Sequence, residues 1–322
     1  MDNTTLLVIA NPTDRELALL EQLPKNVSIA VGSTLEAFER TAPDADVICY
    51  WSTSPKLLQP LWKIAPKVKW VHSRSAGLDS LLFPELVDSQ VMLTNGSGVF
   101  SQSLGEFVIG AAIYFVKDFR RLIRNQVEGV WRQFDCEELA GQTMGIVGYG
   151  DIGRACSRRA HAMGMHVLGL RRRPELSKGD PHVEKVYGFD GLLEMLPQCD
   201  YVVAAAPLAP GTRHLIGEAA IAAMKPTAVV MNVGRGPVID EQALIKALES
   251  GRIKGAALDV FENEPLPAGH PFFKLENVLL SPHCTDHTST WIEDGMRFFI
   301  ANFQRYMASQ PLKNVVDKKA GY

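Results

Sequence analysis

A glycine-rich segment just before the middle of the chain limits the possible folds more than any other feature. It has the pattern G-x-G-x-x-G, with its glycines at Gly148, Gly150 and Gly153. The apolar run at 144–147 predicts a strand before it, and residues 152–163 predict a helix after it. In such a unit the glycines permit the turn, the approach of a pyrophosphate and close helix packing, and the helix N-terminus attracts the phosphates. The segment therefore predicts a dinucleotide site; the alternative is a turn whose glycines serve packing alone. The other loop residues expected at the cofactor are Tyr149, Asp151 and Ile152.

The next predicted strand, at 166–170, ends in three consecutive arginines. A cofactor with a free ribose 2′-hydroxyl usually meets an acidic side chain here, about 20 residues beyond the glycines. Arg171 and Arg172 instead offer guanidinium groups, whose geometry matches a phosphate. We therefore expect NADP(H), with NAD(H) possible; the alternative is a solvated basic turn.

Composition excludes several classes of protein. A chain of 322 residues with 46% hydrophobic and 21% charged residues is typical of a globular protein of about two domains. The net charge of −3 disfavours bulk binding of nucleic acid. No apolar run approaches the roughly 20 residues of a membrane span, and no signal peptide is evident. The five cysteines are scattered and form no C-x-x-C pair, so we expect reduced thiols, no metal site and a cytoplasmic protein.

Four apolar runs before the glycine-rich segment predict strands, at 6–10, 28–31, 46–51 and 68–72. Helical stretches lie between them: one opens at 13–16 with a capping-box pattern, and another covers 35–40. This alternation indicates a parallel sheet covered on both faces. A loop at 73–79 follows the fourth strand, where backbone N–H groups of Ala76 and Gly77 could hold a carboxylate; the local alternative is a plain loop.

A long helix is predicted over 100–125, crossing from the first domain to the second. An irregular arm at 125–141 follows it and carries Trp131. The aromatic and apolar groups of the arm predict an oligomer contact, or alternatively packing on the same subunit.

Later apolar runs at 228–233, 255–260 and 278–281 end shortly before Arg235, Glu264 and His283 respectively. The carboxyl ends of parallel strands meet at one edge of the sheet, where a nucleotide binds. Reduction of a carbonyl needs a proton donor, and histidine is the natural acid near neutral pH. A carboxylate would orient the ring and raise its pKa, and an arginine would bind a substrate carboxylate. Taken singly, each of the three residues also has a plain structural explanation.

Beyond these motifs, the chain resembles the D-isomer-specific 2-hydroxyacid dehydrogenase family nearly end to end. The matching segments are 75–79, 148–153, 231–241, 257–267 and 281–283, and the tail at 311–316 fits less specifically. The resemblance implies an α/β fold of two Rossmann-like domains with the active site in the cleft. A flavodoxin-like substrate domain would comprise 1–98 plus 290–322, and an inserted NAD(P)-binding domain would comprise 99–289.

The resemblance also implies roles for single residues. His283 would be the acid/base, Glu264 its partner and Arg235 a ligand of the 2-oxo acid, whose carboxylate Ala76 and Gly77 would bind. Asp259 would meet the nicotinamide carboxamide. The other residues expected at the cofactor are Ser101, Ala206, Pro207, Val233 and His283. Family members usually form homodimers through the long helix and the arm.

Two departures from the family pattern refine this prediction. The family often has an aspartate at about the position of Arg171. In having an arginine there instead, the chain resembles the NADPH-preferring glyoxylate and hydroxypyruvate reductases. Residues 284–288 are bulkier and more polar than the small residues often found after the histidine. We expect NADPH-dependent reduction of glyoxylate, hydroxypyruvate or pyruvate-like acids to D-2-hydroxy acids. The alternatives are a corepressor-like nucleotide sensor or a phosphoglycerate, formate or phosphite dehydrogenase.

Overall fold

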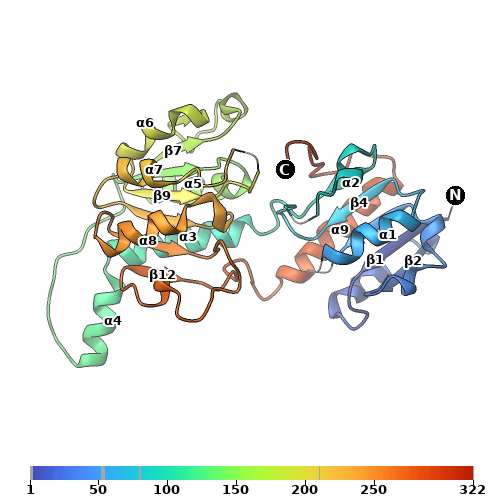
Figure 1. Ribbon diagram of the computed structural model, residues 1–322, viewed down its shortest axis with the longest axis horizontal. Coiled ribbons are helices and arrows are strands. Elements are labelled where there is room, and N and C mark those ends of the chain that lie inside the picture. Colours follow the sequence, from blue (N-terminus) through green and yellow to red (C-terminus); the bar gives the residue numbers. More distant parts are fainter. Residues whose placement is uncertain (1–2, 52–54, 80, 210, 322) are drawn as a thin grey trace. The chain divides into compact units, whose positions relative to one another are not determined.

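The computed structural model describes residues 3–51, 55–79, 81–209 and 211–321. Contacts divide the chain into two compact units. Unit 1 comprises Met1–Val99 and Ser289–Tyr322, and unit 2 comprises Phe100–Thr288. Each unit is built on a parallel sheet with helices on its faces, which confirms the predicted α/β class (Figure 1).

The sheet of unit 1 has the strand order β2-β1-β3-β4-β5, and every neighbouring pair is parallel. This is the order of flavodoxin-like folds. The strands are β1 (Thr4–Ile9), β2 (Val27–Gly32), β3 (Val47–Tyr50), β4 (Trp70–Ser73) and β5 (Met92–Thr94). The helices and single turns are η1 (Arg15–Gln22), η2 (Glu36–Phe38), η3 (Ala42–Asp44), η4 (Pro55–Leu57), α1 (Leu58–Ile64), α2 (Pro84–Asp88) and α9 (Trp291–Met307).

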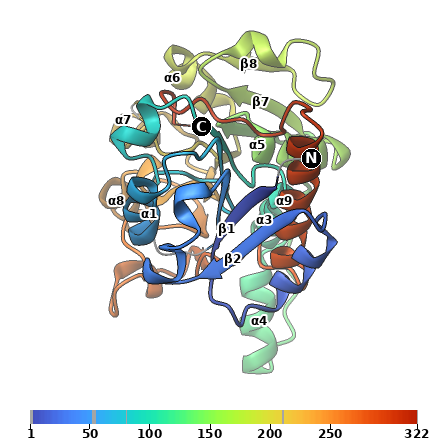
Figure 2. The ribbon, with the colours of Figure 1, turned by 90° about the vertical axis from the view of Figure 1, so that its right-hand side faces the viewer.

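Both faces of this sheet are buried, as expected for a parallel sheet. Alternate residues of β1 pack in opposite directions, because successive side chains of a strand point to opposite faces. Leu6 and Val8 join a core cluster with Phe299 and Phe303 of α9, whereas Leu7 joins a cluster with α1. Figure 2 shows α1 and α9 on opposite sides of β1 and β2. The C-terminal helix is therefore part of the first unit's core.

Two helices predicted in unit 1 differ from the structure. The segment after 13–16 forms the 3-10 helix η1, and its N-cap Asp14 makes no side-chain cap bond. The carboxylate of Glu16 instead accepts a hydrogen bond from Trp51 Nε1 at 2.8 Å, and the Thr13 hydroxyl donates to Asn11 Oδ1 at 3.0 Å, so the predicted capping box does not form. The helix predicted at 35–40 is only the single turn η2, since one buried side chain, Phe38, is all that it packs into the core.

The sheet of unit 2 has the order β12-β11-β10-β9-β6-β7-β8 and is also parallel. The order reverses between β6 and β9, as in dinucleotide-binding Rossmann folds. The strands are β6 (Thr143–Val147), β7 (His166–Leu170), β8 (Lys185–Tyr187), β9 (Tyr201–Ala204), β10 (Val229–Asn232), β11 (Gly255–Leu258) and β12 (Val278–Leu280). The helices and turns are α3 (Ser101–Val116), α4 (Phe119–Glu128), α5 (Asp151–Ala162), η5 (Pro174–Ser177), η6 (Phe189–Gly191), α6 (Leu192–Met195), η7 (Leu196–Gln198), α7 (Glu218–Ala223), η8 (Gly236–Val238), α8 (Glu241–Glu249) and η9 (Pro271–Phe273). Side chains of α6, α7 and α8 pack on one face of the sheet in a single core cluster.

The single long helix predicted over 100–125 is wrong. The chain breaks between α3 and α4 at Asp118, which adopts a left-handed conformation with φ 48° and accepts a hydrogen bond from the Arg121 N–H. Helix α3 buries an apolar stripe, whereas no residue of α4 is buried. Helix α4 and the residues after it project from the sheet of unit 2 (Figure 1). Because no packing onto the sheet requires one axis, a capped break is tolerated.

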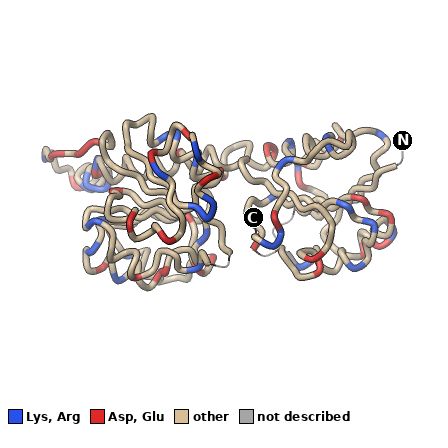
Figure 3. The backbone as a smooth tube through the Cα atoms, turned by 90° about the horizontal axis from the view of Figure 1, so that it is seen from above, with Lys and Arg blue, Asp and Glu red and all other residues tan. Residues whose placement is uncertain are grey.

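Charge is spread over both units. Lys and Arg are interspersed with Asp and Glu along the described chain (Figure 3). This distribution agrees with the small net charge of −3. Among the described residues, no helix combines the length and apolar character that crossing a membrane requires.

Candidate active site

The glycine-rich loop connects β6 to α5, as predicted. Gly148 has φ 103°, and a Cβ there would collide with the backbone of Ala206. A Cβ at Gly153 would lie 2.6 Å from the Gly148 carbonyl oxygen. Packing within the fold therefore requires glycine at both positions. At Gly150 a Cβ would meet no atom of the described chain within 4 Å, so packing does not explain this glycine. The open space beside Gly150 fits the close approach of a pyrophosphate.

The remaining residues of this loop have different orientations. Tyr149 is fully buried, and its hydroxyl donates to Asp180 Oδ2 at 3.1 Å and lies 2.9 Å from Ser157 Oγ. Tyr149 can thus offer a cofactor only its backbone. Asp151 opens α5 and pairs with Arg154 at 3.2 Å, and Ile152 is half-buried.

The arginines stand at the carboxyl end of β7. The Arg171 N–H donates to the Tyr187 carbonyl at 3.0 Å, which continues the strand pairing with β8. Its Nη1 donates to Ser177 Oγ at 2.7 Å, while the Arg172 side chain lies at an exposed position. The half-buried Arg171 guanidinium is therefore anchored at this edge of the sheet.

Four other predicted cofactor residues also lie in unit 2. Ala206 packs against Gly148, and the carbonyl of Pro207 accepts a hydrogen bond from Thr212 Oγ1 at 2.8 Å. Val233 follows β10 and is buried, and the buried Ser101 opens α3. The Thr212 hydroxyl, which sequence reasoning missed, thus shapes the turn after β9.

His283 and Glu264 form a hydrogen-bonded pair. His283 Nδ1 lies 2.6 Å from Glu264 Oε2, and Glu264 Oε1 accepts from the Phe261 N–H at 2.9 Å. His283 has φ 53°, a left-handed conformation that is uncommon outside glycine and concentrates at functional sites. A carboxylate only accepts hydrogen bonds, so Nδ1 carries a proton and Nε2 remains for chemistry.

The pair shifts the pKa of both partners. The Glu264 hydrogen bond raises the pKa of His283 above its usual value; burial opposes this, and the charges of Glu264 and Asp259 add to it. Burial would raise the pKa of Glu264, but the hydrogen bonds from His283 and the Phe261 N–H and the charges of His283 and Arg235 together lower it. The geometry thus favours an imidazolium next to a carboxylate.

Arg235 lies close to this pair. It follows β10, and its Nη1 donates to the Gly234 carbonyl at 2.9 Å. The next residue, Gly236, touches the segment that leads to Glu264 so closely that a Cβ would collide with the Phe261 carbonyl group. Arg235 and His283 also influence each other electrostatically. The structure therefore brings Arg235, Glu264 and His283 together at one edge of the unit 2 sheet.

Asp259 binds the segment that follows His283. Its buried carboxylate accepts hydrogen bonds from Thr285 Oγ1 at 2.7 Å, from the Cys284 N–H at 3.1 Å and from the Thr285 N–H at 3.3 Å. Ser103 Oγ of α3 donates to the Thr285 carbonyl at 2.5 Å. Within the polar segment 284–288, Thr285 therefore fixes the backbone through its hydrogen bonds. The sequence alone did not indicate that partnership.

In unit 1, two carbonyls of the 73–79 loop accept hydrogen bonds from outside the loop. The Gly96 N–H donates to the Ser75 carbonyl at 3.3 Å, and Asn95 Nδ2 donates to the Ala76 carbonyl at 2.7 Å. Within the described residues, the N–H groups of Ala76 and Gly77 donate to no acceptor. These two donors fit a carboxylate, and Asn95 is a supporting residue that the sequence analysis missed.

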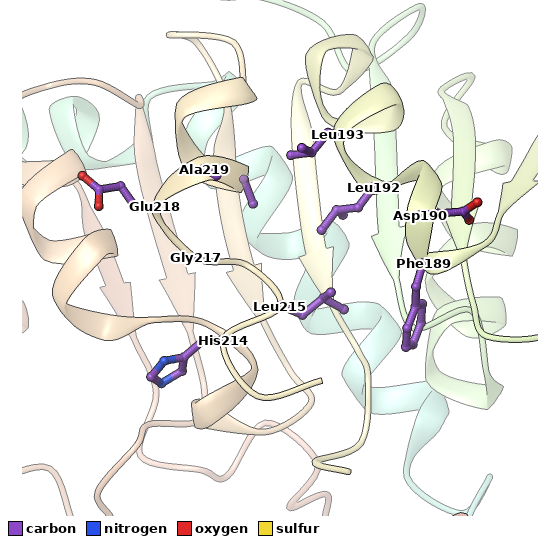
Figure 4. Close-up of a pocket in the computed structure, with 10 residues that line it drawn as sticks. Phe189, Asp190, Leu192, Leu193, His214, Leu215, Gly217, Glu218 and Ala219 are labelled. Carbon is purple, nitrogen blue, oxygen red and sulfur yellow. The ribbon is translucent and has the colours of Figure 1, made fainter. Parts of the chain in front are cut away.

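A separate cavity of about 390 Å³ lies in unit 2. Figure 4 shows Leu192 and Leu193 of α6 on one wall, and Leu215 with the start of α7 on the other. None of Arg235, Glu264 or His283 lines it, so we do not assign the reaction to it. No group of His, Cys, Asp and Glu side chains in the described residues is arranged to hold a metal ion.

A family model and several known proteins match the sequence. A family model described as "D-isomer specific 2-hydroxyacid dehydrogenase, NAD binding domain" matches residues 109–285. A glyoxylate reductase of Thermofilum pendens is 35% identical over 261 residues, which are 79% of this chain and 76% of that protein. A D-3-phosphoglycerate dehydrogenase of Methanocaldococcus jannaschii is 31% identical over 287 residues, 86% of this chain, but the match spans only 52% of that longer protein.

A solved structure is similar over nearly the whole length. It is an NADPH-dependent glyoxylate/hydroxypyruvate reductase from Sinorhizobium meliloti in complex with NADP and sulfate. It has a TM-score of 0.84 and 28% sequence identity, and the match covers 99% of this chain and 100% of that chain.

Proposed function

Because the chain belongs to the D-isomer specific 2-hydroxyacid dehydrogenase family, a family of oxidoreductases with a nicotinamide cofactor, we propose that it reduces small 2-oxo acids with NADPH. The observation that carries the proposal is the 2.6 Å contact between His283 Nδ1 and Glu264 Oε2 beside Arg235. Glyoxylate and hydroxypyruvate are the first substrates to test, since relatives are named for them. Longer acids would give D-2-hydroxy acids.

Each candidate residue has a proposed role in the reaction. A bound NADPH would supply the hydride for the carbonyl carbon. His283, protonated and oriented by Glu264, donates the proton from Nε2 to the developing alkoxide. Arg235 neutralises the substrate carboxylate and polarises the carbonyl. In unit 1, the N–H groups of Ala76 and Gly77 are the proposed donors to the carboxylate of a 2-oxo acid.

The proposed cofactor contacts lie in unit 2. Gly148, Gly150 and Gly153 with the N-terminus of α5 bind the pyrophosphate. The remaining proposed contacts are Ser101, Tyr149 (by its backbone), Asp151, Ile152, Ala206, Pro207, Val233, Asp259 and His283. The preference for NADPH rests on Arg171 and Arg172 at the end of β7, where NAD enzymes usually place an acid. Comparison of kcat/KM for NADPH and NADH tests this preference, and a preference for NADH contradicts it.

A homodimer is the proposed assembly. Helix α4 exposes Leu122, Ile123 and Val127, and the following Trp131 is 96% exposed. Such an apolar surface is unusual on a monomer and typical of an interface. Sedimentation analysis would show a dimer for the wild type and a weakened one for Trp131→Ser combined with Val127→Ser. A wild-type monomer at micromolar concentration contradicts the proposal.

A panel of 2-oxo acids with NADPH tests the activity itself. We expect turnover of at least one short 2-oxo acid, with its loss in the His283→Ala variant. Tight NADPH binding without turnover of any 2-oxo acid would instead indicate a nucleotide sensor.

A further inference from the structure

The loop with Ala76 and Gly77 follows an arginine that makes two cation–π contacts. The Arg74 guanidinium carbon lies over two indoles, 5.5 Å from the Trp51 ring centroid and 5.3 Å from that of Trp291. Trp51 is buried and is fixed by its bond to Glu16, and Trp291 is the first residue of α9. Stacking on two rings confines a cation more than a single contact does. The start of the C-terminal helix thus anchors the residue that enters the loop.

The other side of the loop is held by two asparagines. Asn314 Nδ2, in the tail after α9, donates to the carbonyls of Asn95 and Ser97 at 3.2 and 2.6 Å. Asn95 Nδ2 donates in turn to the Ala76 carbonyl at 2.7 Å. Asn314 has φ 56°, a conformation that asparagine tolerates better than most residues. This chain of hydrogen bonds connects the C-terminal tail to the loop through one intermediate side chain.

The planarity of the peptide bond turns these contacts into directional control. The Ser75 carbonyl and the Ala76 N–H belong to one peptide plane, and the Ala76 carbonyl and the Gly77 N–H belong to the next. Gly96 holds the first carbonyl and Asn95 holds the second. The C=O and N–H of one trans peptide point in opposite directions within the plane, so fixing each carbonyl also fixes the direction of its N–H group.

We propose that Asn314 and Trp291 of the C-terminal segment are positioning residues that aim the Ala76 and Gly77 N–H groups at the substrate carboxylate. They act through Asn95 and Arg74 and do not touch the substrate themselves. The inference rests on the proposed role of this loop in 2-oxo acid binding. In this proposal, residues 289–322 have a second role in unit 1 besides contributing α9 to its core.

Kinetics of tail variants test the asparagine side. Asn314→Gly keeps a residue suited to φ 56° but removes the donor, and Asn314→Asp places an acceptor against two carbonyl oxygens. Because a hydrogen bond contributes about 0.5–1.5 kcal/mol, KM for glyoxylate should rise about two- to tenfold in Asn314→Gly. The kcat value and the Kd of NADPH should stay within about twofold. Lys313→Ala, at an exposed neighbouring position, is the matched control.

The stacked side is tested in the same assay. Arg74→Met removes the cation but keeps most of the apolar stem, and it should raise KM for glyoxylate as Asn314→Gly does. Arg74→Lys should restore part of the loss, because a lysine also interacts with aromatic faces. Arg40→Met, at an exposed position in the same unit, is the control. An Arg74→Met variant with a wild-type KM overturns this half of the proposal.

Hydrogen exchange separates this inference from the proposed activity. In the NADPH-loaded protein, the 73–79 peptide of Asn314→Gly should exchange faster than that of the wild type, and added oxalate should protect it less. If both KM and exchange match the wild type, the positioning role is wrong. If wild type turns over no 2-oxo acid yet the variant's loop exchanges faster, the positioning role survives and the proposed function fails. Should Asn314→Gly fold poorly, Asn95→Asp removes the donor to the Ala76 carbonyl and must give the same two changes.

Discussion

Replacement of Glu264 by glutamine isolates what the carboxylate contributes to the histidine. The carboxylate contacts His283 Nδ1 at 2.6 Å with one oxygen and the Phe261 N–H at 2.9 Å with the other. A glutamine can keep its oxygen on the Phe261 N–H, but it then presents an NH₂ group to Nδ1. Two donors face each other in that arrangement, so the protonated imidazole loses both its acceptor and a neutralising charge.

The size of the effect follows from the exposure of the pair. A hydrogen bond to a charged group contributes about 1.5–3 kcal/mol. The His283 and Glu264 side chains are 44% and 34% exposed, so water screens their interaction and the lower end of that range applies. Because about 1.4 kcal/mol corresponds to a factor of ten, Glu264→Gln should lower kcat/KM for 2-oxo acid reduction about tenfold.

The pH profile carries the more specific signature. Reduction needs protonated His283, and Glu264 raises the pKa of His283, so wild-type activity falls only as pH rises through that raised pKa. In Glu264→Gln the pKa of His283 falls, and the alkaline loss of kcat/KM should move to lower pH. Glu249→Gln, at an exposed position of α8, is the control and should leave the profile unchanged. An unshifted alkaline limb in Glu264→Gln would refute the assignment of His283 as the proton donor paired with Glu264.

Three further predictions concern the same site. His283→Ala should lower kcat about 10²- to 10⁴-fold because the general acid is lost, while calorimetry shows NADPH binding within about threefold of wild type; near-normal turnover contradicts the mechanism. Gly150→Ala should weaken NADPH binding about tenfold or more in the same titration, yet leave Tm within a few degrees because its Cβ enters open space; a large drop in Tm would mean that the fold, not the cofactor, requires this glycine. Arg171→Ala should lower kcat/KM for NADPH about 10- to 100-fold by losing a charge-assisted contact, with little effect for NADH; equal losses for both cofactors would remove Arg171 from the phosphate site.

Much of the fold follows from local sequence patterns. Strands buried on both faces of a parallel sheet read as continuous apolar runs, so β1, β6, β7 and β10 are predictable within a residue or two. The edge strands β5 and β8 span three residues each, include polar residues, and were not predicted, whereas the equally short β12 is wholly apolar and was predicted. The break at Asp118 was also missed, because the helical periodicity continues through it and only the left-handed backbone conformation marks it.

The candidate site divides in the same way. The apolar runs alone show that Arg235, Glu264 and His283 follow successive strands, and parallel strands necessarily present their carboxyl ends at one edge. The folded structure adds that Nδ1 of His283 contacts Glu264, that the Asp259 carboxylate accepts a hydrogen bond from Thr285, and that Asn314 connects to the Ala76 carbonyl through Asn95. The reason is physical. A strand end follows from short-range burial, whereas these contacts join residues far apart in the chain, and their geometry exists only after the sheets and helices have packed.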